Sequence, residues 1–514
     1  MAKEQDEKSA GEPRADLAEV LKAKAATLDE NRPEALAKRD KTGHWTARQN
    51  IEGLLDAGSL QEYGQLAKPA FKLREGPADG LVMGVGAVGG QSIAVAAYDY
   101  TVHAGTQATI NHAKSDRLFH VIENLRLPFV FWTEGGGWRP HENNISARDF
   151  EETFAMMAKL SGQVPTLGIV AGRCFAGNAN VAGLCDTLIA TRKAALGMAG
   201  PPLVESALGI KLTPEELGPP EVHEASGAID ILVEDEAEAV DVAKLYLSYF
   251  RKDNPPCEDT DIPDVMALRD VVPENPRRAY DVRKVISGIA DEGSVLELRP
   301  RFGRAAVVAL IKVNGRPMGV LANQPMFLAG AMDSPACDKL ARFIQLCDAH
   351  DIPMLYLCDT PGLMVGPECE ATALVRHSSR ILTAAVNATT PFMTVVLRKA
   401  YGLGYYMMGS LPVHPTLLVA WPTAEFGAMG LEGAVKITHK QELDQITDQK
   451  ARLQRERELA DEIRARNTAL EVAARFEYDD IIDPADTREV VSKFLTSLPP
   501  VPPRTVRKRT IDNW

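Results

Sequence analysis

Val88-Gly-Gly-Gln-Ser-Ile-Ala-Val95 returns later in the chain as Val313-Asn-Gly-Arg-Pro-Met-Gly-Val320. The offset from residue 88 to residue 313 is 225 positions, and it continues without a gap over about forty residues. A fixed period of this kind indicates two copies of one domain. The same offset aligns further pairs: Ala104-Gly105 with Ala329-Gly330, Lys114 with Lys339, Arg117 with Arg342, and Pro128 with Pro353.

Both halves contain short apolar runs, which are typical of buried strands. Each run precedes a glycine-containing turn and a segment with helical spacing, so we expect an α/β fold with two related domains in tandem. The boundary should lie near Lys252–Pro276, where Asp253-Asn-Pro-Pro-Cys257 interrupts the pattern. The four runs are Leu127–Trp132, Leu167–Ala171, Leu355–Cys358 and Met393–Leu397.

The composition is that of a globular protein, with 514 residues, 45% apolar and 25% charged side chains. A net charge of −13 argues against a nucleic-acid or anionic-membrane partner, because those surfaces attract clustered positive charge. No run of about 18 apolar residues occurs, so we expect a cytoplasmic protein. Seven scattered cysteines without a CxxC pair predict reduced, mostly buried thiols: Cys174, Cys185, Cys257, Cys337, Cys347, Cys358 and Cys369.

Two short motifs suggest nucleotide binding, and the sequence argues against both. Gly84-Val-Gly-Ala-Val-Gly89 satisfies GxGxxG, but the apolar run after it predicts a hairpin rather than a helix. Asp359-Thr-Pro-Gly362 is similar to a nucleotide-hydrolase switch, yet the chain contains no GxxxxGK[ST]. The chain also lacks HExxH, His/Cys ligand spacing and GxSxG, so we expect no metal in it and no serine-hydrolase chemistry.

Two glycine-rich turns occupy matched places in the two halves, Arg173–Asn180 and Lys399–Tyr406. Each turn follows an apolar strand and precedes a short helix, so the first amides of that helix lack intrahelical acceptors. Two such amides aimed at one point form an oxyanion hole. The alternative is that the glycines only permit tight packing of strand on helix. Two copies at matched positions favour a functional role.

Several long motifs, quoted below, resemble the carboxyltransferase subunits of biotin-dependent acyl-CoA carboxylases. The resemblance covers about residues 30 to 492, and two segments, Thr133–Gly137 and Gly172–Gly177, bring it closest to the carboxyltransferase domain of long-chain acyl-CoA carboxylases. The motifs are Arg398-Lys-Ala-Tyr-Gly-Leu-Gly404, Trp421–Gly430, Leu431–Val435, Asp359–Gly362, Ala322–Pro325, Trp45–Arg48 and Leu54–Ser59.

The resemblance implies two crotonase-like domains, an N-terminal one over residues 30–265 and a C-terminal one over 270–495. They are flanked by a polar extension (1–29) and a Pro-rich, basic tail (496–514). It also implies a hexamer built as a trimer of dimers, whose active sites lie where the N-domain of one subunit meets the C-domain of another. The chain has no Met-Lys-Met biotinylation site. We therefore expect a partner polypeptide to supply biotin carboxylase and a biotin carrier domain.

In this family the N-domain amides stabilise a thioester enolate, which here implies Gly177 and Asn178. The C-domain amides hold the ureido oxygen of biotin, which implies Leu403 and Gly404, with Tyr401 and Gly402 beside them. Acyl-CoA is the implied substrate, and Arg173 and Lys399 are candidate contacts to its phosphates. The implied substrate-binding residues are Gly136, Gly137, Phe175, Ala176, Tyr405 and Tyr406.

The chain departs from the common family pattern at both turns. Many relatives have Gly-Gly where this chain has Gly177-Asn178, and a small or acidic residue where it has Tyr406. Tyr406 therefore puts propionyl specificity in doubt, although Tyr405 and Tyr406 could equally be ordinary packing residues. Two other functions stay open: an acyl-CoA decarboxylase subunit, and a non-catalytic scaffolding paralogue in a mixed carboxylase.

Two charged segments lie towards the C-terminus. Thr438–Arg475 has helical spacing and predicts one long, solvated or packing helix ending before Asp483-Pro484. Pro499–Pro503 and the basic residues after it, Arg504 to Arg509, predict an extended tail that either docks on a partner or stays disordered.

Overall fold

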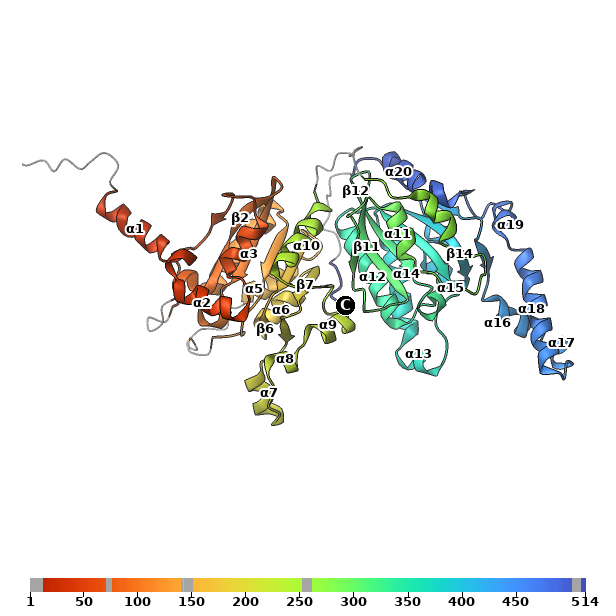
Figure 1. The fold of residues 1–514 in the computed structure, drawn as a ribbon, viewed down its shortest axis with the longest axis horizontal. Helices are drawn as coiled ribbons and strands as arrows, with labels where there is room; N and C mark the ends of the chain where they lie inside the picture. The colour runs from red at the N-terminus through yellow and green to blue at the C-terminus, as the bar shows by residue number, and fades with distance from the viewer. Residues whose placement is uncertain (1–12, 71–75, 140–141, 143–150, 252–260, 502–509) are drawn as a thin grey trace, which may run out of the picture. The chain divides into compact units, whose positions relative to one another are not determined.

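The computed structural model describes residues 13–70, 76–139, 142, 151–251, 261–501 and 510–514 (Figure 1). Asp253–Cys257 and Arg504–Arg509, both singled out from the sequence, lie outside these residues. The chain forms two compact units: Met1–Leu160 with Thr166–Pro220 and Val233–Ala243, and Ser161–Pro165 with Glu221–Leu232 and Lys244–Trp514. The expected α/β class is confirmed, whereas the four expected domain ranges stay predictions. None of the described helices has the length and apolar character that a membrane crossing requires.

The first sheet has the strand order β1-β2-β3-β4-β5-β7-β9, antiparallel from β1 to β3 and parallel from β3 to β7. Its strands are β1 (Gln61–Glu62), β2 (Leu81–Val88), β3 (Gln91–Tyr98), β4 (Phe129–Trp132), β5 (Thr166–Val170), β7 (Thr187–Thr191) and β9 (Ile231–Val233), and β6 (Arg173–Phe175) pairs separately with β8 (Ala195–Gly197). The helices are α1 (Ala15–Ala25), α2 (Pro33–Thr42), α3 (Ala47–Leu54), α4 (Thr109–Leu125), α5 (Glu151–Leu160), α6 (Gly177–Gly183), α7 (Pro201–Leu208), α8 (Pro214–Leu217), α9 (Pro220–Ser226) and α10 (Glu236–Ser248).

The second sheet has the order β10-β11-β12-β13-β14-β15-β17, with β16 beside β14. Its strands are β10 (Leu296–Leu298), β11 (Ala306–Val313), β12 (Arg316–Asn323), β13 (Met354–Thr360), β14 (Phe392–Tyr401), β15 (Leu417–Ala420), β16 (Glu425–Gly427) and β17 (Asp480–Ile481). The helices are α11 (Arg283–Ile289), α12 (Ser334–Ala349), α13 (Pro367–Ala371), α14 (Leu374–Asn387), α15 (Gly402–Met407), α16 (Leu431–Thr438), α17 (Lys440–Asp444), α18 (Gln449–Ala465), α19 (Ala469–Ala473) and α20 (Thr487–Ser497).

The structure confirms the duplication element by element. Hairpin β2–β3 corresponds to β11–β12, α4 to α12, β4 to β13 and α6 to α15, and in each pair the second copy begins 225 positions after the first. The four apolar runs all form strands, as expected. The first turn follows the short strand β6, which comes directly after the central strand β5, and the second turn follows the long central strand β14.

The two hairpins turn in the same way. Gly89-Gly90 and Asn314-Gly315 each have two positive φ angles, which the tight type I′ hairpin turn requires. The Asp56 carboxylate accepts both amides of the first turn at 2.8–2.9 Å, and Asp291 accepts both amides of the second at the same distances. Gly84–Gly89 therefore belongs to a strand and its hairpin, and the interpretation against a dinucleotide loop is confirmed.

Two buried lysines on equivalent helices tie each helix to its sheet. The Lys114 amine donates to the carbonyls of Ala78 and Leu81. The Lys339 amine donates to three carbonyls, those of Arg299, Phe302 and Ala306, at 2.8–3.1 Å. Burial lowers the pKa of Lys114 to about 8 and that of Lys339 to about 7.

The charged segment Thr438–Arg475 does not form one helix, so that prediction is wrong. It is divided into the end of α16 and the separate helices α17, α18 and α19 (Figure 1). The last two breaks coincide with new N-caps, because the Asp448 and Thr468 side chains accept the amides of Ala451 and Glu471. Side chains of α16 to α18 pack around Tyr401 in one apolar cluster, whose buried members include Leu431, Val435, Leu443 and Leu459.

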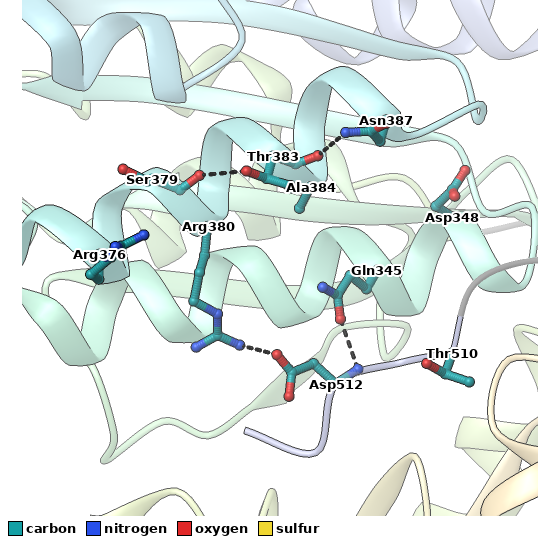
Figure 2. Close-up of a pocket in the computed structure, with 10 residues that line it drawn as sticks. All are labelled: Gln345, Asp348, Arg376, Ser379, Arg380, Thr383, Ala384, Asn387, Thr510 and Asp512. Atoms are coloured by element: carbon teal, nitrogen blue, oxygen red, sulfur yellow. Dashed lines mark hydrogen bonds and ion pairs between the residues drawn. The ribbon is translucent and has the colours of Figure 1, made fainter.

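The last residues of the chain lie across α12 and α14 (Figure 2). The Arg380 guanidinium contacts the Asp512 carboxylate at 2.5 Å, and the Asp512 amide donates to Gln345 at 2.8 Å. Ile511 is buried and exchanges hydrogen bonds with the Ser161 hydroxyl. A pocket of about 500 Å³, to which Gln345, Arg380 and Asp512 contribute, adjoins this segment. The end of the tail is thus ordered on its own chain.

The cysteines agree with the sequence prediction over the described residues. Six are free thiols, and all of these except Cys369 are buried. Cys257 lies outside the described residues.

We predict that Lys339→Met lowers the free energy of unfolding by about 3 kcal/mol, because three buried carbonyls lose their donor while the side-chain volume is kept. Chemical denaturation measures the change. Lys493→Met on α20 is the matched control, since Lys493 is 73% exposed and should change stability by less than about 0.5 kcal/mol. Equal effects of the two substitutions would contradict the anchoring role.

Candidate functional site

The first glycine-rich turn connects strand β6 to helix α6. Ala176 between them has φ 52° and ψ −122°, a conformation that a residue with a side chain rarely adopts. The first hydrogen bond across the helix start runs from the Asn180 amide to the Ala176 carbonyl at 2.9 Å. Among the residues that the structure describes, the amides of Gly177 and Asn178 have no acceptor. These two N–H groups can therefore donate to one anionic oxygen.

A loop of three glycines, Gly135–Gly137, packs against this turn. A Cβ on Gly137 would lie 2.6 Å from the Ala176 Cβ and 3.6 Å from the Gly177 nitrogen, and the φ of Gly137 is 82°. The Gly135 amide donates to the Arg173 carbonyl at 2.8 Å, and the Phe175 amide donates back to the Gly135 carbonyl at 2.9 Å. Only glycine permits this close approach.

The Asn178 side chain holds the loop in place. It is fully buried, its Oδ1 accepts the Gly137 amide at 2.9 Å, and its Nδ2 donates to the Gly105 carbonyl at 3.2 Å. The side chain therefore bonds to Gly137 and Gly105 and does not occupy the main-chain amide of Asn178. The departure from the Gly-Gly pattern of relatives leaves the main-chain donor intact.

The second turn connects strand β14 to helix α15. Gly402 has φ 56°, and a Cβ there would lie 2.9 Å from the Ala428 carbonyl. A Cβ on Gly404 would lie 2.7 Å from the Gly362 Cα, so the loop that contains Gly362 packs tightly against this helix. Within the described part of the chain, no group accepts the amides of Leu403 and Gly404.

The two turns are supported at equivalent backbone atoms by different residues. In the second unit the Thr360 hydroxyl donates to the Gly330 carbonyl at 2.8 Å and accepts the Gly362 amide at 3.1 Å. Gly330 and Gly362 correspond to Gly105 and Gly137 by the 225-residue offset. Thr360 in the second unit and Asn178 in the first thus bridge the same pair of backbone groups.

Buried ion pairs lie behind both loops. Glu134 forms a two-point pair with Arg39 at 2.8 and 2.9 Å. Asp359, its equivalent by the offset, contacts Arg398 at 3.0 Å and Lys399 at 3.6 Å. Desolvated pairs with this geometry fix side-chain orientation strongly. They immobilise the segments from which the glycine loops emerge.

The two candidate phosphate contacts both have protein partners. The Lys399 amine donates to the Ala329 carbonyl at 2.7 Å and is mostly buried. Arg173 is about half exposed and pairs with Glu215 at 2.9 Å. A role in binding CoA phosphates stays a prediction for both. Exposed Arg173 is the better placed of the two.

Within each unit the structure brings the predicted site residues together. The first turn contains Phe175 and Ala176, and the loop with Gly136 and Gly137 packs against it. Tyr401, Gly402, Leu403 and Gly404 form the second, and Tyr405 and Tyr406 follow in the same helix. Their roles in binding stay predictions.

The side chains of the second turn differ in exposure. Tyr405 is buried with its ring edge-on to Phe426 at 5.2 Å, so packing accounts for it. Leu403 is 51% exposed and Tyr406 is 43% exposed, so both present apolar surface beside the turn. Tyr406 is therefore the one of the two tyrosines that a ligand can reach.

The sequence analysis missed four residues around the first turn. They are close to Gly177 or to one another, and they are Gln107, Phe154, His112 and Trp138. A Cβ on Gly177 would lie 3.3 Å from the Gln107 Cδ and 3.4 Å from the Phe154 Cζ. The His112 ring stands 6.1 Å from Phe154 and 6.5 Å from Trp138. Of these four residues, only Gln107 could have been noticed in the sequence, because the 225-residue offset pairs this polar residue with an apolar one, Met332.

Burial lowers the pKa of His112 to about 4, from an ordinary value of 6.5. Between pH 6.5 and 4 the unfolded chain therefore binds a proton at this residue that the folded chain does not, so the contribution of His112 to stability falls as the pH drops through this window and is constant above it. We predict that His112→Phe removes up to about 1.4 kcal/mol per pH unit of this slope. Unfolding measured by denaturant at several pH values checks this. His120→Phe, on the exposed side of α4, controls for the loss of an imidazole.

Comparison with known proteins identifies relatives over nearly the whole chain. The carboxyl transferase domain family matches residues 38–508. The methylmalonyl-CoA carboxyltransferase 12S subunit of Propionibacterium freudenreichii subsp. shermanii is 36% identical over 472 residues, 89% of each chain. The beta4 subunit of the biotin-dependent long chain acyl-coenzyme A carboxylase of Mycobacterium tuberculosis is 33% identical over 433 residues, 82% of this chain and 83% of its own.

Solved structures agree with these relatives. A single-chain, multi-domain long-chain acyl-CoA carboxylase superposes with a TM-score of 0.88 at 44% identity, over 94% of this chain. This chain spans only 49% of that protein. The transcarboxylase 12S hexamer, solved with methylmalonyl-CoA and methylmalonic acid bound, superposes with a TM-score of 0.86 at 33% identity, over 99% of this chain and 100% of its own. The expected pair of crotonase-like domains agrees with both.

Proposed function

The chain belongs to the carboxyl transferase domain family, and we propose from this premise that it transfers CO2 from carboxybiotin to the α-carbon of an acyl-CoA. It is a carboxyltransferase of the biotin-dependent acyl-CoA carboxylase group. The observation that carries the proposal is the pair of turns at which two consecutive helix-start amides lack acceptors among the described residues. The proposed intermediate is a thioester enolate.

The first turn supplies what enolate formation requires. An α-proton of a thioester is weakly acidic, so its removal depends on donors that already point at the developing oxyanion. The amides of Gly177 and Asn178 are such donors, and the loop Gly135–Gly137 and the buried Asn178 side chain hold them fixed. Preorganised amides need no reorientation when the charge develops.

The second turn fits the other reactant. The amides of Leu403 and Gly404 can donate to a ureido oxygen, and Gly362 packs too closely on Gly404 to admit any side chain there. Bound carboxybiotin supplies the CO2 and the nitrogen that accepts the α-proton. Tyr401 and Gly402 position this turn, and the helices α16 to α18 fix Tyr401 by packing on it.

We propose that a separate biotin carboxylase and biotin carrier work with this chain, and that the chain assembles as a homo-hexamer. The hexameric 12S relative supports the second part. The scaffolding alternative rested on the altered pair Gly177-Asn178, and it loses that support because the Asn178 side chain bonds to neighbouring loops while its amide stays available.

The direct test combines the purified chain with its biotin carboxylase and carrier partner. We expect carboxylation that requires ATP and bicarbonate, measured over acyl-CoA thioesters of increasing chain length. Decarboxylation of the carboxylated product without ATP-dependent carboxylation would favour the decarboxylase alternative. No turnover with any thioester by a folded hexamer would contradict the proposal.

We predict that Asn178→Pro lowers kcat by about 10²–10³, because proline deletes one amide donor while a first-turn helix position tolerates it. Asn178→Gly is the matched control, since it keeps the amide while it removes the side chain and its bridge between Gly105 and Gly137, and it should lower kcat by less than about tenfold. Steady-state kinetics on both variants measure the effect. Equal loss in the two would assign the effect to the side chain instead.

We predict that Leu403→Pro likewise impairs transfer from carboxybiotin by about 10² or more, whereas Leu403→Ala keeps the amide and stays close to wild type. Leu403 is half exposed, so its side chain contributes little to the core. The KM for the carrier domain and kcat are both recorded. Activity of Leu403→Pro equal to that of Leu403→Ala would remove the Leu403 amide from the site.

A further inference from the structure

Gln107 is fixed beside the first turn by both its main chain and its side chain. Its amide donates to the Gly137 carbonyl at 2.7 Å, and its carbonyl accepts the Arg139 amide at 2.9 Å. Its Nε2 donates to the Tyr98 hydroxyl on β3 at 2.9 Å. Gln107 and Tyr98 are both 2% exposed, so the carboxamide has one defined position.

The Gln107 carboxamide oxygen lies directly over Gly177. A side chain on Gly177 would collide with this oxygen, and the Gln107 Cδ would stand 3.3 Å from its Cβ. Gly177 is the residue whose amide begins the proposed enolate-binding pair. The group closest to a Cβ built on Gly177 is therefore polar, uncharged and buried.

The second unit shows that the backbone arrangement does not require a polar residue here. Met332 occupies the position 225 residues after Gln107, and its amide donates to the Gly362 carbonyl at 3.1 Å, as the Gln107 amide does to Gly137. Met332 is fully buried. An apolar side chain at this position is therefore compatible with the fold. We take the carboxamide of Gln107 as a sign that the chemistry of the first turn, and not the packing, requires a polar group here.

We propose that Gln107 is a positioning residue for the first turn: its carboxamide, held by Tyr98, packs against Gly177 and places no formal negative charge beside the enolate site. This inference rests on the proposed function. The carboxamide oxygen that faces Gly177 carries only a partial negative charge, whereas a carboxylate of the same shape carries a full charge and would repel the developing oxyanion across a short, poorly screened distance.

The decisive variant is Gln107→Glu, which keeps the shape and adds a charge. Burial raises the pKa of a carboxyl group, so the introduced side chain should become neutral as the pH is lowered. We expect kcat to fall by about 10- to 100-fold at pH 8–9, with little change in KM, and to recover towards the wild-type value on acidification. The pH profile of kcat should contain one titration that the wild-type profile lacks.

Three further variants separate charge from packing. Gln107→Met introduces the residue of the second unit and should lower kcat by less than about tenfold, without a new titration. Tyr98→Phe frees the carboxamide and should lower kcat by about 3- to 10-fold at constant KM, which keeps the test available if Gln107→Glu does not fold. Gln65→Glu adds the same charge at a glutamine bonded to Lys24 and Thr27, remote in sequence from both turns, and should match wild type.

A pH-independent loss in Gln107→Glu, or a wild-type profile in it, would overturn the proposed electrostatic role. Unchanged kcat in Tyr98→Phe would overturn the positioning role. Wild-type protein is measured in the same assay: if it carboxylates an acyl-CoA, these outcomes bear on Gln107 alone, and if it does not, the proposed function itself has failed.

Discussion

One hydrogen-bonded bridge supports each glycine turn: a single buried polar side chain joins the carbonyl of one glycine to the amide of another. Asn178 makes this bridge between Gly105 and Gly137, and Thr360 makes it between Gly330 and Gly362. Because the bridge satisfies the loop, the helix-start amides beside it stay available for a ligand. The two copies keep the same bond pattern although different residues from different elements supply it. Both copies of the domain therefore keep the hydrogen bonds to this glycine carbonyl and this glycine amide, although the residue that makes them differs.

Rigid surroundings let the turns hold strained conformations. Ala176 with φ 52° and ψ −122° costs on the order of 1–3 kcal/mol, and such a residue persists only where its neighbours fix it. The Arg39–Glu134 pair and the Asp359 pairs supply that constraint at the base of the two glycine loops. Their groups are desolvated, so loss of one partner leaves a buried polar group unsatisfied. The proposed chemistry uses main-chain donors, and these buried side chains keep those donors in place.

Some sequence predictions failed or stayed incomplete because they depend on contacts that the order of residues along the chain does not reveal. Thr438–Arg475 has continuous helical spacing, yet the caps at Asp448 and Thr468 divide it, because capping depends on where the preceding backbone places a side-chain oxygen. The sequence also marked Asn178 as a departure from relatives without indicating that its side chain turns to Gly105 and Gly137. Arg173 and Lys399 were named for their charge, whereas their contacts to Glu215 and Ala329 are tertiary.

The sequence by itself determined the duplication, the α/β class, the hairpin nature of Gly84–Gly89 and the location of both turns, since these follow from period, apolar spacing and glycine placement along the chain. Only the tertiary structure decided which amides stay without acceptors among the described residues, which residue bridges each loop, and that Gln107 lies over Gly177. The physical reason is that hydrogen-bond satisfaction and burial depend on groups 30 to 73 positions apart, such as Gly330 with Thr360 and Gly105 with Asn178, whose meeting no local pattern records.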